Sequence, residues 1–267
     1  MAERTLFIAD AHLQPGERPA QQSALANFLR QAAKEAQRLV LLGDTFHLWF
    51  ERRGEAVGDY TQALALFAEA AAAGLRIEMV SGNRDFAVGA GTAADAYAGF
   101  FAPLGDRTPS VLIRYGIQPR GDRFAWTQSG LRLLACHGDI FCRRLYGYRL
   151  LRWLLRNRLS LLGLWYGPMK IARLLANLLQ NRPISTLPDL PAASHILSSA
   201  VAPEIAAGAD IVVCGHVHMH ERRRIVAGKR TGELFVVPPW SHQHEYAEMS
   251  NGRLEVTCKQ RKRLERR

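Results

Sequence analysis

Cysteine is scarce in this chain, and acidic residues are outnumbered by basic ones. Only four of the 267 residues are cysteines, and no two of them have the close spacing of a zinc ribbon or a disulfide framework. We therefore expect a reducing compartment, and neither a disulfide-rich scaffold nor a thiolate zinc site.

Long uncharged segments are also absent. Every window of about 18 residues contains a charged residue, which argues against a hydrophobic transmembrane helix. The nearest candidate, around residues 150–167, is interrupted by Arg152, Arg156 and Arg158. The first residues lead directly into a short strand-like segment, so we expect no signal peptide.

The overall composition is that of a globular protein. With 22 Gly, 12 Pro and 48% hydrophobic residues, wholesale disorder is excluded. The length allows one substantial core, so we expect a single domain over residues 1–267. The 35 Lys and Arg against 24 Asp and Glu give a net charge of +11, which favours a phosphate-bearing substrate, nucleic acid or an anionic membrane as partner.

Apolar segments alternate with helix-like segments in the first half of the chain. This alternation is typical of an α/β fold with parallel strands. The predicted strands are 5–9, 38–42 and 76–80, and the predicted helices are 21–37 and 59–73. After about Ser110 the pattern becomes rich in strands, at 131–136, 210–214, 223–226, 234–237 and 254–258.

Residues 141–191 interrupt this pattern with two helical stretches that are rich in leucine and arginine. The second stretch has an apolar stripe on one face and basic side chains on another. We expect an inserted helical lid within the single domain, and a basic tail over residues 259–267. The lid is interpreted as a membrane or acyl-chain contact; two helices packed on each other and on the sandwich are the alternative.

Polar side chains follow five of the predicted strands at the point where each strand ends. They are Asp10, His12, Asp44, Asn83, His137, His216 and His218. Ligand sites in α/β sheets lie at the carboxyl ends of strands. Taken singly, each cluster is compatible with a turn or a core histidine, but the five together indicate a metal site. Carboxylate and imidazole groups suit two divalent metals about 3.5–4 Å apart, with Mn favoured over Fe or Zn by the hard oxygen ligands.

These clusters resemble the signature of the calcineurin-like metallophosphoesterases. The matching segments are FIADAH at 7–12, LGD at 42–44, GNRD at 82–85, HGD at 137–139 and GHVH at 215–218. The resemblance implies a four-layer αββα sandwich, with two facing sheets and helices outside. It implies that one metal is bound by Asp10, His12, Asp44 and His218. The other metal would be bound by Asp44, as a bridging ligand, Asn83, His137 and His216.

Within that family, the chain is similar to the UDP-2,3-diacylglucosamine pyrophosphatases of lipid A biosynthesis. The similarity rests on GNRDF at 82–86, on the Gly-Asp-x-Phe-x-x-Trp pattern at 43–49 and on the helical insertion. Many family members have His after the motif Asn, where this chain has Arg84. We expect Arg84 to neutralise charge on the phosphoryl oxygens; a salt bridge to Asp85 or Asp139 is the alternative.

The resemblance implies hydrolysis of the pyrophosphate bond of UDP-2,3-diacylglucosamine. A metal-activated water would attack the α-phosphate, giving UMP and 2,3-diacylglucosamine 1-phosphate, with Arg84, Asp44 and Asn83 as catalytic residues. The residues expected to contact the substrate are Asn83, Arg84, Arg149, Arg152, Trp153, Lys170 and Arg173.

Such an enzyme would be cytoplasmic and peripheral on the anionic inner face of the inner membrane, where it meets its lipid-linked nucleotide sugar. We expect no nucleic acid and no obligate protein partner. Two alternatives stay open. One is a metallophosphoesterase for another phosphodiester, such as a nuclease or a small phosphodiesterase. The other is a non-catalytic membrane-binding protein.

Overall fold

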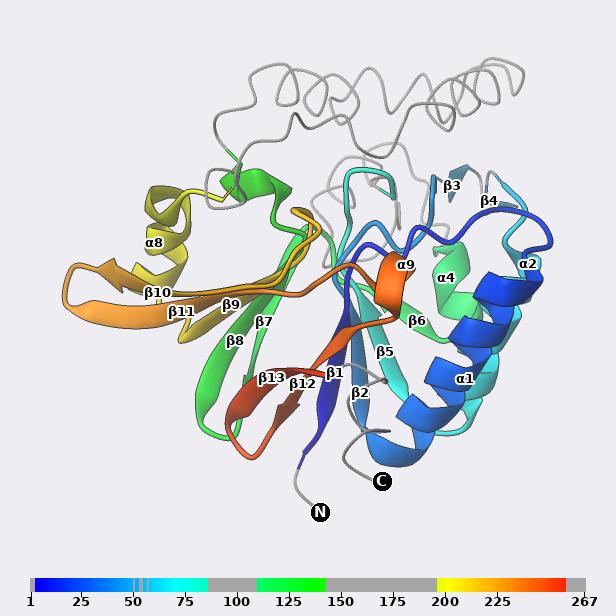
Figure 1. Ribbon diagram of the computed structural model, residues 1–267, viewed down its shortest axis with the longest axis horizontal. Helices are drawn as coiled ribbons and strands as arrows, with labels where there is room; N and C mark the ends of the chain where they lie inside the picture. The colour runs from blue at the N-terminus through cyan, green and yellow to red at the C-terminus, as the bar shows by residue number, and fades with distance from the viewer. Residues whose placement is uncertain are drawn as a thin grey trace, which may run out of the picture.

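The computed structural model describes residues 3–49, 51–52, 55–56, 58–85, 110–142 and 196–257. In this part of the chain, two β-sheets face each other and helices cover their outer faces (Figure 1). The predicted four-layer αββα sandwich is therefore confirmed. The predicted lid from residue 143 onward and the predicted basic tail lie outside the described residues.

The first sheet has six strands in the order β13-β12-β1-β2-β5-β6. Its parallel strands are β1 (Thr5–Ile8), β2 (Arg38–Leu41), β5 (Arg76–Met79) and β6 (Ile117–Pro119). Antiparallel pairing adds β12 (Tyr246–Ser250) and β13 (Arg253–Thr257) at one edge. The helices α1 (Pro19–Glu35) and α2 (Thr61–Ala72) connect the parallel strands, close to their predicted bounds.

The second sheet has five strands in the order β10-β11-β9-β8-β7. The strands are β7 (Arg123–Gln128), β8 (Leu131–Cys136), β9 (Ile211–Cys214), β10 (Glu221–Ala227) and β11 (Arg230–Val236). Helix α8 (Ser198–Ala206) packs on the outer face of this sheet. The shorter elements are β3 (Glu51–Arg52), β4 (Glu55–Ala56), α4 (Val111–Arg114), η2 (Asp139–Phe141) and α9 (Trp240–Gln243).

Three clusters of buried hydrophobic side chains pack the layers together. The cluster between the two sheets includes Phe7 and Val40 from the first sheet and Val213 and Phe235 from the second. The other two clusters lie under the helices that cover the outer faces. Because both faces of each central strand are covered, these strands appear in the sequence as continuous apolar segments rather than as alternating ones. None of the described helices is long and apolar enough to cross a membrane.

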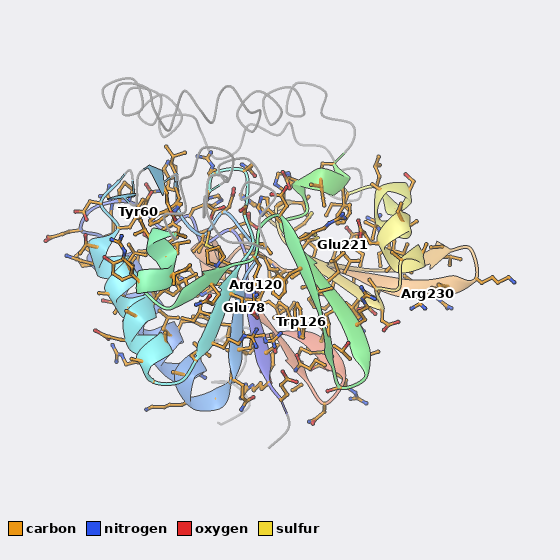
Figure 2. All side chains as sticks on the ribbon, turned by 180° about the vertical axis from the view of Figure 1, so that it is seen from behind. Tyr60, Glu78, Arg120, Trp126, Glu221 and Arg230 are labelled. Carbon is orange, nitrogen blue, oxygen red and sulfur yellow. The ribbon has the colours of Figure 1, made fainter. Side chains whose placement is uncertain are left out.

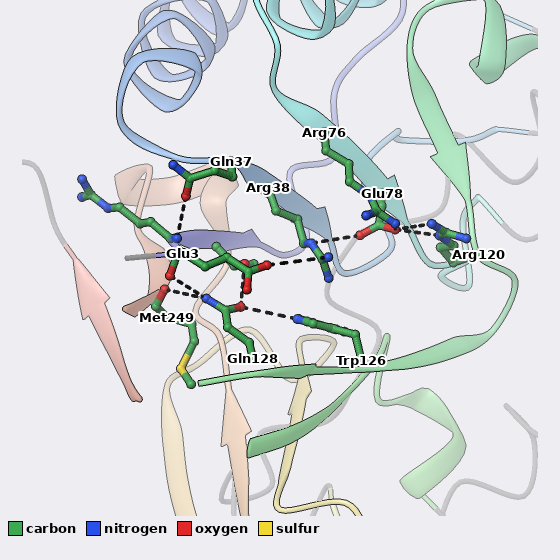
Figure 3. Close-up of polar contacts among 11 residues, drawn as sticks. Glu3, Gln37, Arg38, Arg76, Glu78, Arg120, Trp126, Gln128 and Met249 are labelled. Atoms are coloured by element: carbon green, nitrogen blue, oxygen red, sulfur yellow. Dashed lines mark hydrogen bonds and ion pairs between the residues drawn. The ribbon is translucent and has the colours of Figure 1, made fainter. Parts of the chain in front are cut away.

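A buried carboxylate lies between the sheets, on the third residue of β5. The side chain of Glu78 is 1% exposed and points toward the second sheet, close to Arg120 and Trp126 (Figure 2). Three guanidinium groups converge on it (Figure 3): Glu78 Oε1 lies 2.8 Å from Arg76 Nη2 and 2.8 Å from Arg120 Nε, and Glu78 Oε2 lies 3.4 Å from Arg38 Nε. This cluster neutralises the only charge that β5 buries.

Candidate metal centre

The seven predicted ligands lie on five loops, which follow β1, β2, β5, β8 and β9. The structure brings these loops together at the carboxyl ends of the strands. In one part of the centre, the ring nitrogen His218 Nε2 lies 3.5 Å from Asp10 Oδ1 and 3.4 Å from His12 Nε2. The loop after β1 of the first sheet and the loop after β9 of the second sheet are therefore in contact.

The other part of the centre is organised around His137. Its Nε2 lies 2.9 Å from Asn83 Oδ1, 3.1 Å from His216 Nδ1 and 3.6 Å from Asp44 Oδ1. His137, Asp44 and Asp10 are buried. Oxygen and nitrogen ligand atoms from three other loops thus surround this ring nitrogen.

Two groups of three side chains have ligand atoms that all lie within 4.8 Å of one another. They are Asp10, His12 and His218, and Asp10, Asp44 and His137. Asp10 belongs to both groups, a position that the sequence did not indicate. The family resemblance instead implies Asp44 as the bridging ligand, and that assignment stays a prediction.

Five of the seven predicted ligands have a left-handed backbone. The φ angles are 51° at Asp10, 45° at His12, 48° at Asp44, 74° at His216 and 55° at His218. Non-glycine residues rarely adopt this region, at a cost of about 1–2 kcal/mol each. Strain that recurs at one cluster of polar side chains is typical of a functional site, where the rest of the fold holds the strained backbone in place.

Two glycines let the loops after β2 and β5 approach each other. A Cβ added to Gly82 would lie 2.3 Å from the backbone nitrogen of Asp44 and 2.3 Å from its Oδ1. A Cβ added to Gly43 would lie 2.8 Å from the Cα of Gly82, and Gly43 also has a φ of +82°. Only glycine fits at these positions, because any side chain would push Asp44 away from Asn83.

The hydrogen bonding of His137 tests whether the residues suit a cation. Its Nδ1 lies 2.9 Å from the carbonyl oxygen of Leu42, so Nδ1–H donates to this oxygen. The Nε2 of a neutral ring then presents a lone pair to the oxygens of Asn83 and Asp44. Three lone-pair donors that face one another need either a proton or a cation between them.

The electrostatics of the centre agree with this requirement. Burial opposes a charged ring, yet the carboxylates of Asp44, Asp10 and Asp139 raise the pKa of His137 to about 9. Burial, with a smaller contribution from the charge of Arg84, lowers the pKa of His12 to about 4. Burial and the charge of His137 likewise lower the pKa of His216 to about 4. The carboxylates attract positive charge, while two of the rings stay neutral and able to bind metal.

The spacing of the imidazoles also fits. His12 Nε2 is 3.4 Å from His218 Nε2, and His216 Nδ1 is 3.1 Å from His137 Nε2. Two nitrogens that bind one cation at about 2.1 Å, with an angle of about 90–109°, are about 3.0–3.4 Å apart. The donor set and its spacing are therefore suited to divalent cations.

Arg84 and Asp85 follow the motif Asn83, and both form hydrogen bonds with the loop that carries Asp44. Arg84 does so through its backbone, whereas Asp85 does so through its side chain. The backbone N–H of Arg84 donates to Asp44 Oδ1 at 2.8 Å, and its side chain is half-buried. The carboxylate of Asp85 accepts hydrogen bonds from backbone N–H groups, including those of Thr45 at 2.7 Å and Gly82 at 2.6 Å. The sequence placed Asp85 in the motif without assigning it this role.

Five predicted substrate contacts cannot be compared with the structure, because they lie outside the described residues. They are Arg149, Arg152, Trp153, Lys170 and Arg173. Asn83 and Arg84 are described: Asn83 lies beside His137, and Arg84 lies beside Asp44.

Known proteins of one family are similar to this chain. A model of the calcineurin-like phosphoesterase family matches residues 3–220. The UDP-2,3-diacylglucosamine hydrolase of Ralstonia nicotianae is 32% identical over 250 residues, which cover 89% of this chain and 84% of the relative. The protein of the same name from Stutzerimonas stutzeri is 31% identical over 245 residues, which cover 89% of this chain and 91% of the relative.

Proposed function

Because this chain belongs to the calcineurin-like phosphoesterase family, we propose that it is a metal-dependent hydrolase that cleaves the pyrophosphate bond of UDP-2,3-diacylglucosamine. The observation that carries this proposal is the convergence of the oxygens of Asn83 and Asp44 on His137 Nε2. The name shared by the two relatives, each aligned with 89% of this chain, supports the substrate.

The family implies divalent metal ions, and we propose that two are bound, with Mn²⁺ preferred for the oxygen-rich ligand set. One ion would be held by Asp10, His12, Asp44 and His218, and the other by Asp44, Asn83, His137 and His216. When bound, two such ions supply Lewis-acid charge at the phosphoryl group and lower the pKa of a water ligand toward neutral.

The protein's own groups would orient and neutralise the substrate. Arg84 would pair with phosphoryl oxygens, because its guanidinium presents several N–H donors in a planar fork. The Leu42 carbonyl, which accepts the Nδ1–H of His137, fixes the ring so that Nε2 faces the site. We propose that the bond breaks at the α-phosphate, so that water adds to phosphorus and UMP and 2,3-diacylglucosamine 1-phosphate are released.

We also propose that the enzyme works at the cytoplasmic face of the inner membrane. A substrate with two acyl chains resides in a bilayer, so its pyrophosphate group lies at the membrane surface. The net charge of +11 would attract the protein to an anionic leaflet. Binding to vesicles that contain anionic lipid, with release by salt, is the expected behaviour.

Incubation of the purified protein with UDP-2,3-diacylglucosamine and Mn²⁺ tests the function directly. We expect release of one UMP for each lipid 1-phosphate formed. Single-stranded DNA and a simple aryl phosphodiester serve as comparison substrates, and we expect much slower cleavage of both. Rapid cleavage of DNA with no UMP release would show that the substrate proposal is wrong.

Removal of divalent metal is expected to abolish this activity. Treatment with EDTA followed by buffer exchange should reduce UMP release to background, and Mn²⁺ should restore it. The melting temperature should also fall on chelation, because Asp10 and Asp44 are then left buried without a divalent counter-charge. Scanning fluorimetry and metal analysis of the same samples would check both effects. Full activity in a metal-free sample would contradict the proposed chemistry.

Replacement of Arg84 is expected to slow the reaction without loss of metal. Arg84→Ala should lower kcat by about 10²–10³-fold, the usual effect of removing one donor that stabilises transition-state charge. Arg84→Lys keeps the charge but loses the planar fork, so an intermediate kcat is expected. Steady-state kinetics would be measured together with metal content. A kcat for Arg84→Ala within twofold of the wild type would assign Arg84 a structural role.

A further inference from the structure

Asp85 is a fully buried carboxylate that takes no part in the predicted ligand set. Its Oδ1 accepts hydrogen bonds from the backbone N–H groups of Gly82 at 2.6 Å and Asp44 at 3.1 Å. Its Oδ2 accepts hydrogen bonds from those of Thr45 at 2.7 Å and Phe46 at 3.5 Å. One side chain therefore serves four backbone donors.

These donors belong to two different loops. Asp44, Thr45 and Phe46 follow β2, whereas Gly82 and Asp85 follow β5. The first loop carries the carboxylate of Asp44, and the second carries the amide of Asn83. Backbone N–H groups that are buried in loops must find an acceptor, and here a single carboxylate supplies it across the two loops.

A carboxylate is the group that this position requires. Each of its oxygens faces two N–H donors, so both must act as acceptors only. Asn at this position would turn one NH₂ toward two N–H donors, which breaks hydrogen bonds on that side and adds repulsion. Because Asn has nearly the same shape, the change would act through hydrogen bonding and charge rather than through packing.

We propose that Asp85 is a positioning residue that ties the Asp44 loop to the Asn83 loop and so sets the geometry of the metal site shared by Asp44, Asn83 and His137. This inference rests on the proposed two-metal function. Asp85 contacts neither metal nor substrate in this role. It acts by holding Asp44 and Asn83 at the distance that one cation requires.

The group of Asp10, His12 and His218 has separate support. The backbone N–H of His216 donates to Asp10 Oδ2 at 2.9 Å, which joins the loops after β1 and β9. Loss of Asp85 should therefore weaken one metal site more than the other.

Calorimetric titration of Mn²⁺ into metal-free Asp85→Asn tests the proposal. We expect two sites in the wild type. In the variant, one site should keep its affinity within a few-fold, and the other should weaken by about 10–100-fold, the usual effect of losing an outer-shell partner. At subsaturating Mn²⁺, kcat should fall while KM changes little, and added Mn²⁺ should recover part of the kcat.

The matched control is Glu51→Gln. Glu51 is also a buried carboxylate that links two segments, because it accepts hydrogen bonds from Ser110 Oγ at 2.6 Å and from the backbone N–H of Val111 at 3.0 Å. Neither segment carries a predicted ligand. We expect this variant to lower the melting temperature and to keep two Mn²⁺ sites of wild-type affinity, which separates positioning from general stability.

Hydrogen exchange on the metal-free wild type adds a measurement that does not need the variant to fold. The amides of Thr45 and Gly82 lie in loops, yet they should exchange slowly because Asp85 accepts their hydrogen bonds. Exchange at the rate of unprotected loops would overturn the inference. So would an Asp85→Asn variant that binds two Mn²⁺ with unchanged affinities.

These outcomes are separable from the test of substrate. If Asp85→Asn loses affinity at one site only, the inference holds even when the wild type releases no UMP, and the substrate proposal alone fails. If the wild type releases UMP and Asp85→Asn binds both metals normally, the function stands and the inference fails.

Discussion

Asp44→Asn is expected to lower kcat/KM for UDP-2,3-diacylglucosamine by about 10³-fold, at the upper end of the range for one electrostatic group in an active site. Asp44 Oδ1 lies 3.6 Å from His137 Nε2 and accepts a hydrogen bond from the Arg84 backbone at 2.8 Å. The side chain therefore links one predicted metal ligand to the residue expected to bind phosphate. Loss of its negative charge is expected to weaken both metal binding and the hydrogen bond that positions Arg84.

The same variant is expected to keep or gain stability when metal is absent. Asp10, Asp44 and Asp85 are buried close together, and burial together with the charge of Asp44 raises the pKa of Asp85 to about 7. Removal of the Asp44 charge relieves this repulsion, as expected where a functional site is held at a cost in stability.

Kinetics, Mn²⁺ titration and the melting temperature of the metal-free protein would check both parts. Asp59→Asn is the control, because Asp59 is an exposed aspartate near the start of α2 and should change none of the three. An Asp44→Asn variant with near wild-type kcat/KM would remove Asp44 from the centre. A melting temperature of metal-free Asp44→Asn below that of the metal-free wild type would contradict the stability argument.

Much of the centre was predictable because the polar residues follow strands that bury both faces. Such strands appear as short apolar segments, and in an α/β fold their carboxyl ends lie at one edge. The sequence therefore predicted that Asp10, Asp44 and His137 would converge, although they are far apart in the chain. The distances within the centre confirm that convergence.

Other features depended on three-dimensional context that no local pattern carries. Helix α8 was not predicted, because Pro203 lies inside it and the helix is only nine residues long. Strand β12 contains only five residues, and its pairing with β1 decides its conformation. The role of Asp85 depends on backbone N–H groups of a loop about 40 residues away in sequence, and backbone groups leave no trace in the sequence.

Glu78 is the clearest example of such a feature. In the sequence it is one charged residue within the apolar segment of β5, and nothing there indicates which residues neutralise it. The structure shows three arginines, from the starts of β2 and β5 and from the segment after β6 (Figure 3). The guanidinium of Arg38 also lies 5.0 Å from the ring centre of Trp126, so the cluster joins the two sheets.

Glu78→Gln is expected to lower the free energy of unfolding by about 3 kcal/mol, at the low end of the range for breaking a buried ion pair. Arg38 is 11% exposed and would keep only its ion pair at 3.9 Å with Glu3, which is 45% exposed. Arg76, in contrast, is 53% exposed and would turn to water. The low end applies because two of the three arginines stay partly hydrated and Gln keeps one acceptor oxygen.

Urea denaturation at neutral pH would measure this loss, and thermal unfolding should show a fall of about 6–12 °C for a chain of this size. Arg76→Gln is the matched control, because this exposed arginine should contribute less than about 1 kcal/mol. Since neither Glu78 nor the three arginines around it is a predicted metal ligand or substrate contact, kcat of the folded Glu78→Gln protein should match the wild type. A change in unfolding free energy below about 1 kcal/mol for Glu78→Gln would show that the three arginines do not depend on this carboxylate.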